Sequence, residues 1–210
     1  MKLGILVNSH TDYQAALVLL LHTLRGWPDI AVVQGGYKET GGLVLRDVPV
    51  TKATHDSYDC TSLIELIRDS SGILPGCTHV LCLQDTMQAG SRTLPILRSW
   101  RPKEFKAHAA WGGLCNLVIY ERDYLESKAE FINQQRNHSK LDSIKLEGSL
   151  YHQVPDHLRT GLLHCGRPET RGIHHPYNDT PRLLEYYRCL DLIKWKANYG
   201  QNMQALITTL

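Results

Sequence analysis

The chain has 210 residues, of which 42% are hydrophobic and 21% are charged, and its formal net charge is +2. These values are typical of a folded globular domain, so the composition argues against an intrinsically disordered chain. A charge of +2 without any block of Lys and Arg residues also argues against a nucleic-acid-binding protein.

The sequence contains no recognisable targeting or membrane segment. The apolar run at residues 3–7 is too short for a signal peptide, and the run at residues 15–21 is far below membrane-spanning length. The six cysteines show neither Cys-x-x-Cys pairs nor the density of a disulfide-rich secreted domain. We therefore expect a soluble cytoplasmic protein with reduced thiols and no zinc site.

The beginning of the chain predicts a βαβ unit. Residues 3–7 form a continuous apolar run, as in a strand buried on both faces. Apolar residues at helical spacing follow over residues 13–24, and a second strand over residues 30–33 ends at Gly35 and Gly36. Strand, helix and strand within about 30 residues predict two parallel neighbouring strands.

The next segments predict a third strand of the same sheet. Residues 41–52 alternate apolar and polar side chains, as in a partly exposed strand or a loop. A helix over residues 63–67 can be capped by Asp59 or Thr61. The third strand, residues 79–83, then leads into Gln84 and Asp85.

The three predicted strands all end in polar or glycine residues. These ends are Asn8–His10, Gly35-Gly36 and Asp85. In an open α/β sheet, ligands bind beyond the carboxyl ends of the strands, so Asp85 is a candidate to hold a metal ion or a substrate. The alternative is that Asp85 simply begins a loop or caps a helix.

The second half of the chain predicts shorter elements. We expect a short helix over Thr93–Trp100, a strand over Leu114–Tyr120, a helix over Glu121–Gln135, and a strand or a helix start over Ser143–Leu150. A loop-rich stretch with four prolines follows, and then two apolar segments at residues 183–187 and 192–197. Because no repeat or linker interrupts the chain, one domain is the simplest organisation.

Several common sequence motifs are absent. The chain has no Gly-x-Gly-x-x-Gly after its first strand, no Gly-x-x-x-x-Gly-Lys-Ser/Thr and no Gly-x-Ser-x-Gly. These absences argue against a classical dinucleotide-binding fold, a P-loop protein and an α/β-hydrolase, respectively.

An ordered set of short motifs resembles a known family. The set comprises Asn8-Ser9-His10, Gly35-Gly36, Leu83-Gln84-Asp85-Thr86 with Gly90, Asn116–Tyr120, Pro181–Tyr187 and Asp191–Gly200. Together these motifs resemble small glycosyltransferases of the GT-A fold, and most of all the chlorella-virus type that decorates the major capsid protein.

The resemblance implies an α/β fold with an open, mostly parallel central sheet and helices on both faces. Residues 1–210 would form a single glycosyltransferase domain, with residues 1–100 as the nucleotide-binding half and residues 101–210 as the acceptor-side half. This domain would be either the whole protein or a part of a longer one. It also implies a nucleotide-sugar donor, expected to be a UDP-sugar, and a Mn²⁺ or Mg²⁺ ion. The enzyme would transfer a hexosyl or deoxyhexosyl group to a hydroxyl of a glycan or glycoprotein, in the host cytoplasm if it is encoded by a virus.

Site residues follow from the resemblance position by position. Asn8, Ser9, His10 and Tyr13 would border the base and ribose, Gly35 and Gly36 would admit the nucleotide, and Asp59 would contact the uracil or ribose unless it is a helix N-cap.

The metal site implied by the resemblance is incomplete in this sequence. GT-A enzymes usually carry Asp-x-Asp at the end of this strand, and Leu83-Gln84-Asp85 retains the second aspartate alone. Asp85 would therefore bind the metal with help from His174 or His175, which otherwise belong to a solvated loop. Alternatively, the diphosphate could be neutralised by Arg92, Arg171 or Arg182.

An inverting transferase also needs a carboxylate to accept the proton of the attacking hydroxyl. Glu147 is the candidate, because it lies beside a glycine that allows close approach, and Asp142 and Asp123 are its rivals. Trp111, before Gly112-Gly113, would form a platform for a sugar or else fill the core.

Two other functions remain open at this level. A nucleotidyltransferase shares this kind of sheet but carries a glycine-rich basic loop after its first strand, and Asn8-Ser9-His10-Thr11-Asp12 has no such loop. A non-catalytic module that binds a sugar or nucleotide would explain the incomplete Asp-x-Asp. Binding of a nucleoside diphosphate without turnover would favour the non-catalytic module.

Overall fold

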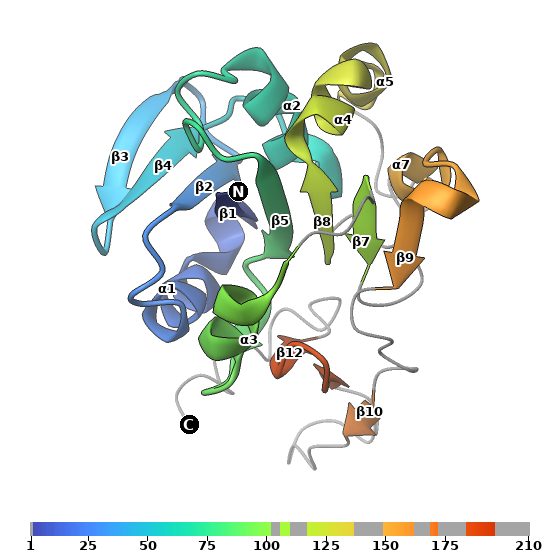
Figure 1. Cartoon of the computed structure of the whole chain (residues 1–210). Helices are drawn as coiled ribbons and strands as arrows, with labels where there is room; N and C mark the ends of the chain where they lie inside the picture. Colours follow the sequence, from blue (N-terminus) through green and yellow to red (C-terminus); the bar gives the residue numbers. More distant parts are fainter. Residues whose placement is uncertain are drawn as a thin grey trace.

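A computed structural model of the protein describes residues 2–101, 106–109, 117–136, 149–161, 169–171 and 184–195 (Figure 1). The strands are β1 (Leu3–His10), β2 (Ile30–Gly35), β3 (Gly41–Leu45), β4 (Val48–Lys52), β5 (His79–Gln84), β6 (Met87–Ala89), β7 (Ala107–Ala109), β8 (Val118–Glu121), β9 (Arg159–Gly161), β10 (Glu169–Arg171), β11 (Leu184–Tyr187) and β12 (Leu192–Trp195). The α-helices are α1 (Gln14–Thr23), α2 (Thr61–Arg68), α3 (Thr93–Ser99), α4 (Arg122–Ser127), α5 (Ala129–Gln134) and α7 (Ser149–His152). Short 3-10 helices are η1 (Thr11–Tyr13), η2 (Tyr58–Cys60) and η3 (Asp156–Leu158).

Over the described residues, the central sheet has eight strands in the order β3-β4-β2-β1-β5-β8-β7-β9. Strands β4, β2, β1 and β5 run parallel to one another, and β9 runs parallel to β7. Strand β3 pairs antiparallel with β4, and β8 pairs antiparallel with both β5 and β7. The expected α/β architecture, an open and mostly parallel sheet with helices on both faces, is confirmed, and the GT-A type stays a prediction.

The apolar runs of the parallel strands fill two cores, one on each face of the sheet. Side chains alternate between the faces, so Ile5 and Val7 join one cluster while Leu6 joins the other. The first cluster packs against α1 and α3, and the second packs against α2, α4 and α5 (Figure 1). Burial on both faces explains why these strands read as continuous apolar runs.

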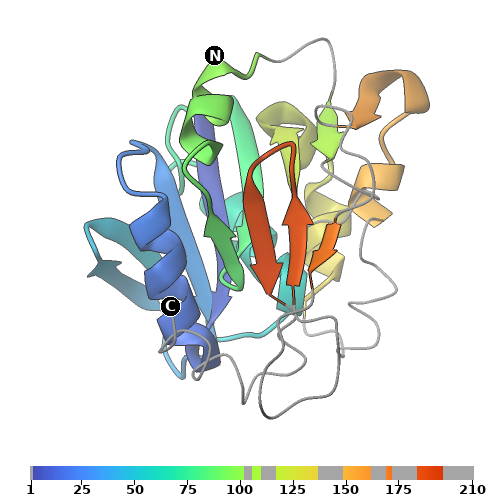
Figure 2. The same ribbon diagram turned by 90° about the horizontal axis from the view of Figure 1, so that it is seen from below.

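A second sheet, in the order β10-β11-β12-β6, lies on the α1 and α3 side of the central sheet (Figure 2). Asp191, between β11 and β12, fastens this sheet to the turn after β6. Its carboxylate accepts hydrogen bonds from the Arg92 N–H at 2.9 Å and from the Tyr186 hydroxyl at 2.8 Å. Its carbonyl accepts one from the Gly90 N–H at 2.7 Å. A Cβ on Gly90 would lie 2.4 Å from Oδ2 of Asp191, so the turn requires a glycine.

The structure corrects several local expectations. Residues 41–52 form the β3–β4 hairpin, and the helix expected over residues 121–135 is divided at Lys128 into α4 and α5. The strand expected over residues 114–120 is described from Val118 and extends to Glu121. Cys189 is disulfide-bonded, so the expectation of reduced thiols is wrong at that position, whereas Cys60, Cys77 and Cys82 are free thiols.

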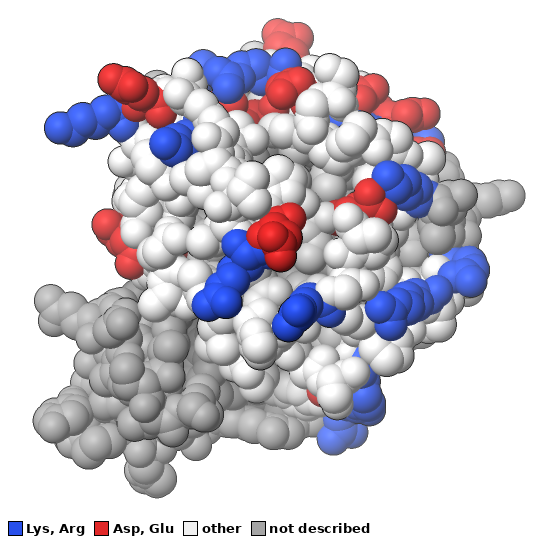
Figure 3. Space-filling view, turned by 90° about the vertical axis from the view of Figure 1, so that its left-hand side faces the viewer, with Lys and Arg blue, Asp and Glu red and all other residues white. Residues whose placement is uncertain are grey.

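The face seen in Figure 3 carries Lys and Arg side chains beside Asp and Glu side chains. Such a mixture of both charges is typical of a solvated protein surface. Among the described residues, no helix has the length and apolar character needed to cross a membrane.

The α1 face of the core provides a stability test. Leu20, on α1, is fully buried in the first cluster, and Val44, on the edge strand β3, is 72% exposed. We expect Leu20→Ala to lower the free energy of unfolding by about 2–5 kcal/mol, because it leaves a cavity. Val44→Ala should change it by less than about 0.5 kcal/mol. Urea unfolding measures both, and equal effects would contradict the assignment of the core.

Candidate functional site

The carboxyl ends of β1, β2, β4 and β5 meet at one edge of the central sheet. Strand β1 lies between β2 and β5, with Ser9 paired to Gln34 and Asn8 paired to Gln84. The chain goes from β1 to β2 on one side and returns to β5 on the other, so the strand order reverses here. Such a switch point is where open α/β sheets bind ligands.

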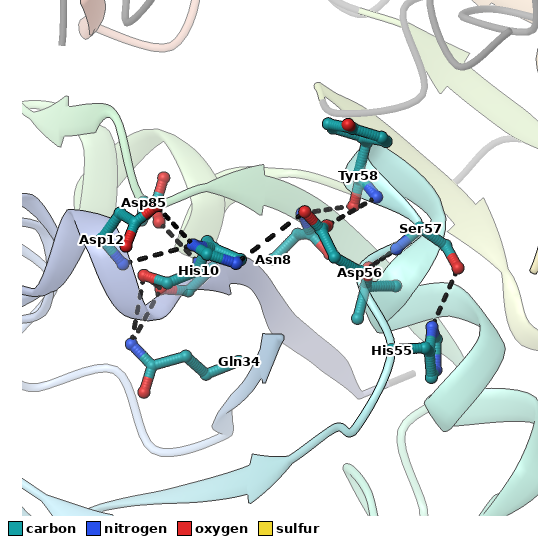
Figure 4. Close-up of polar contacts among 11 residues, drawn as sticks. Asn8, His10, Asp12, Gln34, His55, Asp56, Ser57, Tyr58 and Asp85 are labelled. Atoms are coloured by element: carbon teal, nitrogen blue, oxygen red, sulfur yellow. Dashed lines mark hydrogen bonds and ion pairs between the residues drawn. The ribbon is translucent and has the colours of Figure 1, made fainter. Parts of the chain in front are cut away.

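Asp85 joins the ends of β1 and β5. Its Oδ2 accepts a hydrogen bond from the His10 N–H at 3.1 Å, and the hydroxyl of Ser9 and the N–H of Thr86 also donate to the carboxylate (Figure 4). Its own N–H donates to the Asn8 carbonyl at 3.0 Å. The side chain is held inside the protein, because Asp85 is only 5% exposed.

Burial dominates the electrostatics of Asp85. It raises the pKa of the carboxyl to about 7, although the hydrogen bonds from His10, Ser9 and Thr86 lower it. The negative charge of Asp59 raises the pKa further. Asp85 is therefore a carboxyl group that changes its charge close to neutral pH.

His10, the last residue of β1, places an imidazole ring at this edge of the sheet. Its Nδ1 lies 3.2 Å from the Asp12 N–H and 3.3 Å from Oδ2 of Asp12. In the neutral tautomer in which Nδ1 accepts the Asp12 N–H, Nε2 carries the ring proton. Nε2 lies 3.8 Å from Oδ2 of Asp56 (Figure 4). The structure thus places an N–H donor and a carboxylate acceptor side by side.

Gly35 and Gly36 have close neighbours within the protein. Gly36 adopts a φ of 89°, and a Cβ there would lie 2.6 Å from Nε2 of His10. A Cβ on Gly35 would lie 2.9 Å from the His55 carbonyl oxygen. Both glycines therefore allow the end of β2 to pass close to His10 and His55, and admission of a nucleotide stays a prediction.

Asn8 connects β1 to the segment that begins α2. Its Nδ2 donates to the Tyr58 carbonyl at 2.9 Å, and its Oδ1 accepts from the Ser62 N–H at 2.9 Å. Both polar atoms of the amide thus bind protein groups, so Asn8 ties β1 to η2 and α2.

Asp59 lies in η2 and reaches the end of β5. Its Oδ1 accepts a hydrogen bond from Nε2 of Gln84. The N-cap position of α2 is Cys60, which makes no side-chain capping bond, so capping by Asp59 is not observed. Thr61 also does not cap α2 and instead accepts a hydrogen bond from the Ser57 N–H at 2.8 Å. Asp59 therefore belongs to the group of carboxylates at the sheet edge.

Tyr13 and two residues that the sequence did not single out complete the edge. Burial raises the pKa of Tyr13, and the negative charges of Asp85, Asp12 and Asp56 raise it further. The first of the two residues that the sequence did not single out is Gln34, which is buried and donates from Nε2 to Ser9 Oγ at 3.3 Å. The second is Asp56. Asp56 follows β4, and the sequence signal for it was the polar run His55-Asp56-Ser57 after an ambiguous strand.

A divalent cation needs several ligand atoms that converge on one point. Among the described residues, no group of three or more His, Cys, Asp or Glu side chains could hold a metal ion. The carboxylate of Asp85 already accepts hydrogen bonds from His10, Ser9 and Thr86. The described residues therefore do not fit a complete metal site, and His174 and His175 lie outside them.

The remaining candidates are distributed as follows. Glu147, Asp142, Trp111 and Arg182 also lie outside the described residues, as does the side chain of Arg171. Asp123 is in the first turn of α4, which begins where β8 ends beside His79 at the start of β5. Asp123 is thus at the opposite edge of the sheet from Asp85. Arg92 donates to the Tyr186 hydroxyl at 3.1 Å and pairs with Asp191.

Comparison with known proteins gives similarities of structure. No protein-family model and no curated protein sequence matches the chain. The chain is similar to the crystal structure of a glycosyltransferase involved in the glycosylation of the major capsid of PBCV-1, with a TM-score of 0.44 and 11% identity, covering 75% of this chain and 82% of that one.

The glycosyltransferase GlyE of Streptococcus pneumoniae TIGR4 is also similar, with a TM-score of 0.46, 11% identity and coverage of 77% of this chain and 46% of that one. The apo form of GlyE is similar with a TM-score of 0.41 and 13% identity, and the similarity covers 74% of this chain and 41% of that one. The chain thus spans less than half the length of the GlyE chains. Similarity at this level assigns neither a function nor a residue role.

The raised pKa of Asp85 predicts a pH dependence of stability. The carboxyl binds a proton more tightly in the folded chain, where its pKa is about 7, than in the unfolded chain, where it is about 3.9. Its contribution is therefore complete below about pH 4 and is lost as the pH rises to about 7. With a chelator present, the free energy of unfolding of the wild type minus that of Asp85→Asn should fall across this range.

Asp191→Asn is the matched control for this measurement. Burial by itself raises the pKa of Asp191, but hydrogen bonds from Arg92 and Tyr186 outweigh it and lower the pKa overall. The contribution of Asp191 is therefore present above about pH 4 and lost as the pH falls below it. A wild-type-minus-variant difference for Asp85→Asn that stays constant between pH 4 and 7 would contradict the buried, proton-binding carboxyl.

Proposed function

We propose that the protein is a glycosyltransferase that moves a sugar from a nucleotide-sugar donor to an acceptor hydroxyl on a glycan or glycoprotein. The observation that carries the proposal is the convergence of His10, Tyr13 and Asp85 at the switch point of the open, mostly parallel sheet. The ordered motifs of the sequence support the same assignment.

The chemistry of this edge suits the nucleoside end of such a donor. Asp56, Asp59 and Tyr13 supply hydrogen-bond acceptors, and His10 supplies an N–H donor. Hydroxyl and N–H groups of a ribose and a base are the natural partners of such acceptors. A UDP-sugar is the proposed donor, and a hexosyl or deoxyhexosyl group is the proposed cargo.

The same carboxylates would repel a diphosphate unless a cation lies between them. Mn²⁺ or Mg²⁺ bound through Asp85 with His174 or His175 is one proposed source of that charge, and an arginine is the other. When bound, a divalent ion would supply charge compensation for the departing diphosphate. Because the described residues do not complete a metal site, no step is assigned to the ion.

The transfer step needs an acceptor for one proton. The oxygen of the acceptor hydroxyl attacks the anomeric carbon as the bond from that carbon to the diphosphate breaks, and the nucleoside diphosphate leaves. In an inverting reaction, the hydroxyl proton passes to the carboxylate of Glu147, which is the proposed catalytic base.

A cytoplasmic location of the protein stays a prediction from the sequence.

Calorimetric titration tests the proposed function directly. We expect UDP to bind the protein and a UDP-sugar to release UDP slowly in the absence of acceptor. Titration of UDP and GDP with Mn²⁺ and with a chelator separates the two sources of positive charge, because a metal site predicts tighter binding with Mn²⁺. Absence of binding of either nucleotide under both conditions would contradict a nucleotide-sugar transferase.

Binding without turnover would have a different meaning. If UDP binds but no UDP-sugar is hydrolysed or transferred, and Asp85→Ala leaves the affinity unchanged, the non-catalytic binding module is the better assignment. Release of inorganic diphosphate from a nucleoside triphosphate and a sugar phosphate would instead indicate a nucleotidyltransferase.

Glu147→Gln tests the proposed base. Removal of a general base should lower kcat by about 100-fold or more, with little change in the affinity for UDP. Asp123→Asn is the control, because Asp123 is exposed at the opposite edge of the sheet and should leave kcat unchanged. Turnover by Glu147→Gln at the wild-type rate would remove Glu147 from the mechanism.

A further inference from the structure

The segment between β4 and α2 is held by contacts with β2 and with α2. We call residues His55–Tyr58 the 55–58 loop. It follows Ala53, whose N–H donates to the Gln34 carbonyl at 2.9 Å, and it passes so close to β2 that Gly35 has no room for a Cβ beside the His55 carbonyl. The loop lies opposite His10 at the carboxyl edge of the sheet (Figure 4).

The inner side of the loop is fixed by buried polar groups. Nε2 of His55 lies 2.9 Å from Oε1 of Glu65 on α2, and Nδ1 lies 2.8 Å from the hydroxyl of Ser57. His55, Ser57 and Glu65 are all buried, and Arg68 pairs with the other oxygen of Glu65. The imidazole thus ties the loop to α2 from within.

The outer side of the loop adopts a costly backbone conformation. Tyr58 has a φ of 50°, in the left-handed region that non-glycine residues rarely adopt. Two contacts hold it there, because its N–H donates to Oδ1 of Asp56 at 2.9 Å and its carbonyl accepts from Asn8. Backbone strain of this kind persists where surrounding contacts fix it, and it is concentrated at ligand sites.

A buried His–Glu pair is also a poor device for stability alone, because apolar residues of the same size often stabilise as well or better. Here the His55–Glu65 pair fixes the position of the 55–58 loop relative to α2. That position leaves the Asp56 carboxylate beside His10, with its side chain 39% exposed.

Asp56 retains an oxygen for a ligand. Oδ1 is occupied by the Tyr58 N–H, and Oδ2 lies 3.8 Å from Nε2 of His10, which is longer than a hydrogen bond. Oδ2 and the His10 N–H therefore form an adjacent acceptor and donor that a ligand can bind together.

We propose that Asp56 binds a hydroxyl or N–H group of the nucleoside part of the donor, and that His55 is the positioning residue that holds Asp56 beside His10. The proposal rests on the proposed function, because it takes the ligand of this edge to be a nucleoside diphosphate derivative.

Asp56→Asn and Asp12→Asn form a matched pair of variants. Both remove one negative charge beside His10 and keep the side-chain shape, but Asp12 is assigned no ligand contact. We expect Asp56→Asn to weaken UDP binding in calorimetry by about 10-fold or more, as for the loss of a hydrogen bond to a charged group. Asp12→Asn should weaken it by less than about 3-fold. Equal effects of the two variants would overturn the contact and leave a general charge effect.

The group that Asp56 binds can be identified with 2′-deoxy-UDP. If Asp56 binds the ribose 2′-hydroxyl, Asp56→Asn should weaken the binding of UDP but not that of 2′-deoxy-UDP. If Asp56 binds another hydroxyl or a base N–H, the substitution should weaken the binding of both ligands equally. Either result supports the contact, whereas unchanged affinity for both ligands overturns it.

The positioning role of His55 is tested by a double-mutant cycle. We expect His55→Gln to weaken UDP binding in the wild-type background and to add little in the Asp56→Asn background, because both act through one contact. Equal weakening in both backgrounds would overturn the positioning role. Melting temperatures check that each variant is folded, and if His55→Gln does not fold, Ser57→Ala replaces it in the same cycle.

The outcome also separates this inference from the proposed function. If the wild type binds neither UDP nor GDP, both fail together. If the wild type binds UDP and Asp56→Asn binds it equally well, this inference fails while the proposed function stands.

Discussion

The structure depends on the position of β1 between two parallel strands. Because β2 and β5 pair with both of its edges and a core packs on each face, every residue from Leu3 to Val7 is enclosed. The polar residues of β1, Asn8 to His10, therefore follow this apolar run at the carboxyl end of the strand. The resulting edge gathers Ser9, His10 and Asp85, whose mutual hydrogen bonds join the ends of β1 and β5.

The sequence predicted those parts of the fold that depend on local pattern. Continuous apolar runs identified β1, β2 and β5, and helical spacing identified α1. Strands of three residues, such as β6 and β7, were missed because their pairing partners, not their own residues, make them strands. The break at Lys128 was missed for a similar reason, since the spacing of apolar residues continues across it.

The candidate site shows the same division. Strand ends can be read from a sequence, so His10 and Asp85 could be named as candidates, and Tyr13 lies in η1 directly after β1. The three residues do lie together, while their roles in binding stay predictions. The direction in which Asp85 points could not be read, because its burial depends on backbone N–H groups of a neighbouring strand. Asp56 was missed because β4 alternates polar and apolar residues and its carboxyl end was not recognised.

The contact between Gly90 and Asp191 has a consequence for how the chain acquires its structure. Strand β6 emerges from the ribosome about a hundred residues before β12, the strand that pairs with it. Contacts so distant along the chain form slowly, since a long loop must close first. During synthesis, β6 therefore presents an unpaired edge, and the second sheet is expected to be the last part of the protein to assemble.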